Sequence, residues 1–119
     1  MTSTNMKRNE IWWVHLDPTV GQEIQKMRPC IIVNDDTIGT LPLRVIVPLT
    51  DWKERYNYSD WMVKIDIDNQ NLLAKTSSAD CFQIRSVSTN RFSHTKGGRI
   101  NDTDMQQIEK ALAIVLKIN

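Results

Sequence analysis

Long hydrophobic runs are missing from this sequence. None of its apolar stretches approaches the roughly 20 residues that a membrane-spanning helix needs, and its first residues show no charged-then-apolar leader. Hydrophobic residues make up 40% and charged residues 24% of the 119 positions, which is ordinary for a soluble globular domain. We therefore expect a cytoplasmic protein that does not contact a membrane.

An excess of one charge is also missing. Lys and Arg number 15 and Asp and Glu number 14, so the formal net charge is +1. Proteins that coat duplex nucleic acid present a strongly basic face, and the charge balance argues against that class. It still allows a short, local contact with a few phosphates.

Cysteine and histidine are scarce. His15 and His94 are isolated, and no spacing of Cys and His is typical of a metal site, so we expect neither a metal nor another cofactor. Cys30 and Cys81 both lie in apolar, strand-like stretches. Without an export signal, buried free thiols are favoured over a disulfide between them, although pairing stays open.

The apolar pattern predicts one α+β domain over residues 9–119, preceded by a flexible tail over residues 1–8. Apolar runs rich in β-branched residues predict strands over 10–16, 30–33, 43–50 and 61–68, then a strand or a bent pair of strands over 76–87. Pro48 implies an edge position or a bulge. Short, bent strands favour a small, partly open antiparallel β-barrel.

The last part of the chain predicts an amphipathic helix. Gly97 and Gly98 are expected to break the chain before a short extended piece, and Asn101 is a good N-cap. One stripe at helical spacing is expected to pack on the core: Met105, Ile108, Leu112, Val115 and Leu116.

One pair of residues points to phosphate chemistry. Pro29 keeps Arg28 extended at the start of one predicted strand, and Thr50 ends the next. If these strands are antiparallel neighbours, the two residues lie side by side, where a guanidinium and a hydroxyl can bind phosphate oxygens. A salt bridge from Arg28 to Glu23 or Asp51 is the alternative.

Several segments occur in an order and spacing that resemble the MazF/PemK family of toxin endoribonucleases. They are residues 10–14 (EIWWV), 17–19 (DPT) with Gly21 and Glu23, 28–29 (RP) with 31–33 (IIV), 47–50 (VPLT), 83–87 (QIRSV) and the terminal helix. The resemblance implies a five-stranded, SH3-like barrel and a homodimer. It implies metal-independent cleavage of single-stranded RNA at a short recognition sequence. It also implies a partly disordered, MazE-like antitoxin in the RNA groove, with DNA contacted only through that antitoxin.

Residue by residue, the resemblance implies that Arg28 and Thr50 are the catalytic pair. It places Glu23, Gln83 and Arg85 among the substrate-binding residues, with Glu23 also a candidate general base. The hypothesis is attack by the RNA 2′-hydroxyl on the adjacent phosphorus. Two competitors share the fold: a CcdB-like toxin that binds gyrase, and a non-catalytic interaction domain.

Two departures from the family pattern stand out. Asn9 replaces a usual glycine, and residues 78–80 (SAD) are more polar than the usual apolar run, which leaves the pairing of that strand open. Trp52, Tyr56 and Tyr58 are candidates for stacking on RNA bases, with core or dimer contacts as the alternative.

Overall fold

A bent antiparallel sheet and one C-terminal helix make up the fold. The computed structural model describes residues 6–38 and 41–119. The strands are β1 (Glu10–His15), β2 (Met27–Ile32), β3 (Leu43–Asp51), β4 (Met62–Ile65), β5 (Ser77–Asp80), β6 (Arg85–Ser88) and β7 (Phe92–Arg99), and the helix is α1 (Asp102–Leu116). The predicted α+β class is confirmed, although seven strands stand where the family resemblance implied five.

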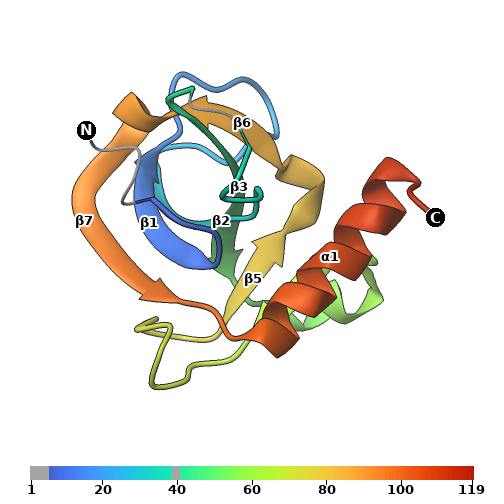
Figure 1. Cartoon of the computed structure of the whole chain (residues 1–119). Helices are drawn as coiled ribbons and strands as arrows, with labels where there is room; N and C mark the ends of the chain where they lie inside the picture. The colour runs from blue at the N-terminus through green and yellow to red at the C-terminus, as the bar shows by residue number, and fades with distance from the viewer. Residues whose placement is uncertain (1–5, 39–40) are drawn as a thin grey trace.

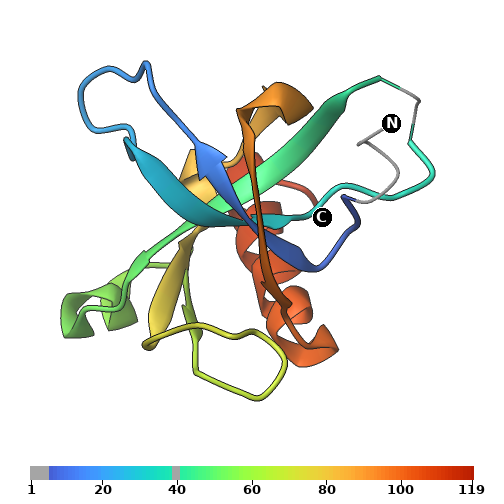
Figure 2. The same ribbon diagram turned by 90° about the vertical axis from the view of Figure 1, so that its left-hand side faces the viewer.

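The sheet runs in the order β4-β5-β3-β2-β1-β7, with β6 beside β3 off this path. It curves strongly, as Figures 1 and 2 show. Within the described residues, the end strands β4 and β7 are not paired with each other. The sheet is therefore open, and the predicted barrel is not confirmed.

The long strand β3 changes partner at Pro48. Its first part pairs with β6 as far as Ile46, and its last part pairs with β5 from Leu49 onward. Proline has no backbone N–H to donate. Pro48 lies between the part of β3 that pairs with β6 and the part that pairs with β5, so on this side of β3 it removes no hydrogen bond of the sheet. On its other side, Pro48 faces Cys30 of β2.

The core has two parts because neighbouring residues of the inner strands point to opposite faces. Ile31 packs with Leu49, Ile65 and Ile108, whereas Cys30 packs with Trp12, Val14 and Phe92. The two cysteines are free and buried, as predicted, and burial raises the pKa of each thiol to about 12.

Helix α1 begins where the sequence predicts. The Asn101 side chain accepts a hydrogen bond from the Asp104 backbone N–H at 2.7 Å, which caps the first turn. Met105 and Ile108 are buried, but Leu116 is 53% exposed, so its predicted core position is wrong. The C-terminal end of α1 projects beyond the sheet (Figure 1).

Strand β7 was not predicted. Gly97 and Gly98 do not break the chain but lie inside this strand, which pairs with β1. A Cβ at Gly98 would lie 2.0 Å from the Gln70 carbonyl oxygen, so this glycine permits a close approach of two backbones. The glycine pair therefore reflects packing rather than a turn.

The last residues of the predicted N-terminal tail contact the rest of the domain. Residues 1–5 of the predicted tail lie outside the described residues, whereas Met6 is buried and Arg8 donates to the Val33 carbonyl and pairs with Glu109. Residues 39–40 also lie outside the described part. No helix in that part is long and apolar enough to cross a membrane.

Candidate active site

Arg28 and Thr50 line one cavity. The pairing of β2 with β3 reaches Cys30 opposite Pro48. Arg28 lies two residues before Cys30 and Thr50 two residues after Pro48, so both lie just beyond the same end of this pairing. Both side chains are half-buried and border a cavity of about 360 Å³, which we call the Arg28 pocket. Trp13, Asp51 and Lys75 also line it.

The carboxylates considered as salt-bridge partners of Arg28 have other contacts. Asp51 pairs with Lys75 at 3.0 Å, and Glu23 accepts a hydrogen bond from the Val20 backbone N–H at 2.6 Å. Arg28 donates from Nε to the Gln25 carbonyl at 3.2 Å. A guanidinium in an open pocket beside a hydroxyl can bind two oxygens of a phosphate while the hydroxyl donates to a third.

The loop at residues 71–75 forms one wall of the Arg28 pocket. Asn71, only 1% exposed, organises this loop, because its side-chain oxygen accepts from the Leu73 N–H at 3.1 Å and its amide donates to the Asp66 carbonyl at 2.8 Å. The loop is thereby fixed by hydrogen bonds to its own backbone.

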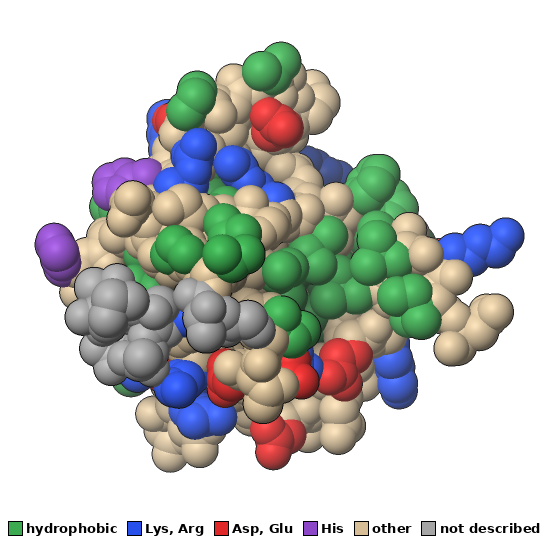
Figure 3. Space-filling view, turned by 45° about the horizontal axis from the view of Figure 1, so that its top comes forward, with side chains coloured by type: hydrophobic (Ala, Val, Ile, Leu, Met, Phe, Trp, Pro, Cys, Tyr) green, Lys and Arg blue, Asp and Glu red, His purple; other side chains and the backbone are tan. Residues whose placement is uncertain are grey.

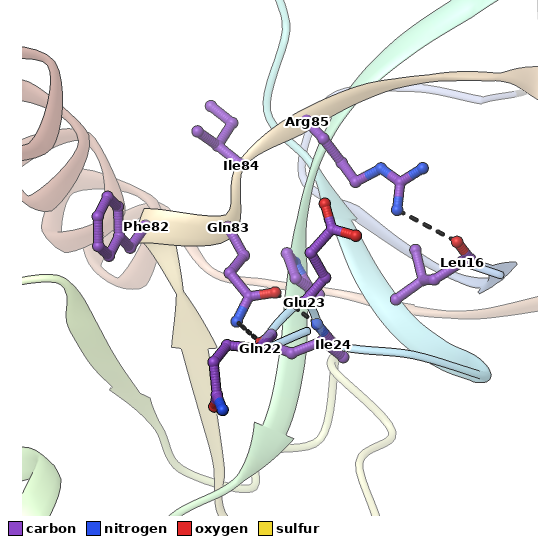
Figure 4. A pocket seen from close by; sticks show the side chains of 9 residues that line it. Leu16, Gln22, Glu23, Ile24, Phe82, Gln83, Ile84 and Arg85 are labelled. Carbon is purple, nitrogen blue, oxygen red and sulfur yellow. Dashed lines mark hydrogen bonds between the residues drawn. The ribbon is translucent and has the colours of Figure 1, made fainter. Parts of the chain in front are cut away.

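Glu23, Gln83 and Arg85 meet in a second cavity of about 500 Å³, the Gln83 pocket (Figure 4). It lies between the β1–β2 loop and the start of β6, and Pro48 contributes to it. Arg85 donates to the Leu16 carbonyl at 3.2 Å, at the base of the loop. The structure thus divides the predicted site residues between two pockets, both lined by the last residues of β3.

Comparison with known proteins identifies the family. Residues 7–116 match the family described as PemK-like, MazF-like toxins of type II toxin–antitoxin systems. The chain belongs to this family.

Two curated relatives resemble it over nearly its whole length. It is 30% identical to the endoribonuclease MazF9 of Mycobacterium tuberculosis, covering 95% of this chain and 98% of the relative. It is 29% identical to the endoribonuclease PemK of Escherichia coli, covering 95% and 84%. Among solved structures, an endoribonuclease of a mycobacterial species in complex with its cognate antitoxin has a TM-score of 0.75 at 18% identity, covering 95% of this chain and 96% of the other.

Trp13 of this PemK-like chain lies in the strand predicted over residues 10–16 but was not among the predicted site residues. It is 37% exposed and lines the Arg28 pocket, facing Pro29 across the β1–β2 pair. A signal was present: two consecutive tryptophans must point to opposite faces of a strand. Only Trp12 is buried in the core.

The three aromatic residues considered for base stacking differ in their surroundings. Trp52 and Tyr56 pack edge to face at 5.8 Å, and the Lys64 ammonium lies 5.3 Å from the Trp52 ring centre. Tyr58 is 91% exposed. None of the three lines either pocket.

Proposed function

We propose that this chain is the toxin of a type II toxin–antitoxin system and a sequence-specific endoribonuclease. It cleaves single-stranded RNA, above all messenger RNA met in the cytoplasm, and thereby stops translation and growth. The observation that carries this proposal is the shared lining of one open pocket by Arg28 and Thr50, in a family whose relatives include two named endoribonucleases.

The proposed reaction is a transesterification. The RNA 2′-oxygen forms a bond to the adjacent phosphorus while the bond from phosphorus to the 5′-oxygen breaks. The 2′-hydroxyl proton leaves and the 5′-oxygen gains one, so the products are a 2′,3′-cyclic phosphate and a 5′-hydroxyl. Because the substrate supplies its own nucleophile, the step calls for neither a metal-bound water nor a protein nucleophile.

The two side chains have different parts in this step. The Arg28 guanidinium holds the phosphate and stabilises the charge that builds on its oxygens. The Thr50 hydroxyl donates to a non-bridging oxygen. One such donor contributes about 3–4 kcal/mol to the transition state. Glu23, the candidate general base, lies in the neighbouring Gln83 pocket.

The proposed assembly is a homodimer whose RNA groove is also the binding site of the antitoxin. Several large apolar side chains are exposed, among them Phe82, Ile114, Leu116 and Ile118. Figure 3 shows hydrophobic side chains gathered on one face of the molecule. Contiguous apolar surface of this kind supports binding to protein partners.

The test is cleavage of labelled single-stranded RNA by the purified protein in EDTA. We expect fragments with cyclic-phosphate ends, a loss of roughly 100- to 1,000-fold in rate for Thr50→Val, and a larger loss for Arg28→Ala. The control is Arg99→Ala, because Arg99 is exposed on β7 and lines neither pocket. Intact RNA with the wild-type protein, or equal rates for Arg28→Ala and Arg99→Ala, would refute the proposal.

A further inference from the structure

The Gln83 side chain joins the β1–β2 loop to the sheet. Its Oε1 accepts a hydrogen bond from the Ile24 backbone N–H at 2.5 Å. Its Nε2 donates to the Gln22 carbonyl at 3.3 Å and to Asp80 Oδ2 at 3.1 Å. A side-chain amide has two N–H donors, so the chain itself uses both. Gln83 is therefore occupied in holding the loop and has no N–H to offer an RNA base.

The anchor of this connection is rigid. Asp80 is 5% exposed and ends β5, whose four residues are all buried and which pairs with both β3 and β4. The other carboxylate oxygen of Asp80 accepts from the Phe82 backbone N–H at 3.2 Å. By contrast, Gln22, Glu23 and Gln25 in the loop are exposed. Gln83 thus connects an exposed loop to a fixed point in the core.

The loop leads directly to Arg28. Gln25 follows the residues that Gln83 holds, and its carbonyl accepts the hydrogen bond from Arg28 Nε at 3.2 Å. This bond orients the guanidinium where it borders the Arg28 pocket. If residues 22–24 shifted, the Gln25 carbonyl would shift with them.

We propose that Gln83 is a positioning residue: supported by Asp80, it fixes residues 22–24 and, through the Gln25 carbonyl, aims the Arg28 guanidinium. This rests on the proposed function for its effect on RNA cleavage. The effect on the loop belongs to the free protein and can be measured whether or not RNA is cut.

The first test compares Gln83→Ala with Gln107→Ala, a glutamine on the exposed face of α1. In the free protein, hydrogen exchange of the Ile24 amide should become about tenfold faster in Gln83→Ala, since one hydrogen bond is lost. Cleavage should show kcat lowered roughly 10- to 100-fold by misplacement of Arg28, with a smaller effect on KM. Gln107→Ala should match the wild type in all three measurements. Where Gln83→Ala fails to fold, Gln83→Met keeps the stem of the side chain and removes the amide.

The second test reverses the hydrogen bond between Gln83 and Asp80. Gln83→Glu alone would bring two carboxylates together and should release the loop, because like charges at hydrogen-bond distance repel. Adding Asp80→Asn supplies an amide that can donate to Glu at position 83, while the new carboxylate still accepts from Ile24. The double variant should therefore recover part of the Ile24 protection and of kcat relative to Gln83→Glu, because the Gln22 carbonyl still lacks the donor that the Gln83 amide supplies. Asp80 lines neither pocket, so a direct RNA contact by Gln83 would not be restored this way.

Three results would overturn the positioning role. They are unchanged Ile24 exchange in Gln83→Ala, a raised KM with unchanged kcat in that variant, or no recovery in the double variant. A wild-type protein that leaves RNA uncut would instead refute the proposed function, and the exchange measurements would still decide whether Gln83 holds the loop.

Discussion

Gly98 offers a sharp test of how the wall of the Arg28 pocket is built. A Cβ at this position would meet the Gln70 carbonyl oxygen at 2.0 Å and the Asn71 carbonyl carbon at 2.6 Å. Both contacts are to backbone, so no side chain can rotate away and either β7 or the turn at residues 70–71 must move. Overpacking costs about 1–3 kcal/mol and occasionally more. Because the clash is with backbone atoms, we expect Gly98→Ala to cost about 3 kcal/mol, at the upper end of this range.

The measurement is urea unfolding followed by circular dichroism, with Gly21→Ala as the matched control. At Gly21 a Cβ would meet nothing within 4 Å, but the backbone φ is +59°, so the cost there is that of a left-handed conformation, about 1 kcal/mol. The two alanine variants therefore separate steric crowding from backbone strain. A Gly98→Ala variant no less stable than Gly21→Ala would refute the close packing of β7 on the turn.

The same substitution should also affect the site. Residues 71–75 form a wall of the Arg28 pocket, and Asn71 is the residue that fixes their course. A turn displaced by Gly98→Ala should lower the rate of RNA cleavage in protein that is still folded.

Two further predictions concern stability. Burial alone would raise the pKa of Glu10, but hydrogen bonds from the Lys7 N–H, Lys96 and Trp12 lower it below its ordinary value. The charged carboxylate therefore stabilises the fold above the ordinary pKa, and this contribution is lost as the pH falls through the lowered pKa. Glu10→Gln should cost about 2 kcal/mol at pH 7, and the difference from wild type in urea unfolding should shrink in acid. A difference independent of pH would contradict this. Asn101→Ala removes the cap of α1 and should cost about 1 kcal/mol by the same assay, whereas Asn101→Ser, which keeps a capping oxygen, should cost less.

Local signals predicted the parts of the fold that depend on neighbouring residues. The cap at Asn101 and the stripe through Met105 and Ile108 place α1 within its observed bounds, because capping and helical spacing are properties of a short segment. Leu116 continues the same stripe yet is exposed. Whether the last turn of α1 packs on the sheet depends on the position of the helix relative to the sheet. The spacing of apolar residues along the helix does not predict that position.

The features of the fold and of the site that could not be predicted from the sequence depend on contacts between distant segments. Gly97 and Gly98 resemble a turn on local grounds. The structure explains Gly98 by the approach of the Gln70 carbonyl and Gly97 by that of the Ile11 carbonyl, both from elsewhere in the chain. Arg28 and Thr50 could be paired from the sequence because one assumption, antiparallel neighbours, was enough. Gln83 and Ile24 are 59 positions apart, and no pair of strands neighbouring in the sequence brings them together. Their hydrogen bond could therefore not be predicted.

The hydrogen bond between Asp80 and Gln83 offers a physical explanation for the polar segment at residues 78–80. A buried carboxylate normally destabilises a fold, and burial raises the pKa of Asp80 even though hydrogen bonds from the Phe82 N–H and Gln83 oppose the shift. An apolar residue in this fully buried strand would avoid that cost. The carboxylate is useful only if its fixed oxygens hold something in place, and Oδ2 holds the Gln83 amide that reaches the β1–β2 loop. The polarity that departs from the family pattern therefore lies where a rigid support for the loop is needed. Asp80→Leu should accordingly release Ile24, because the Gln83 amide loses its fixed partner, and an Ile24 amide that stays protected in this variant would argue against the explanation.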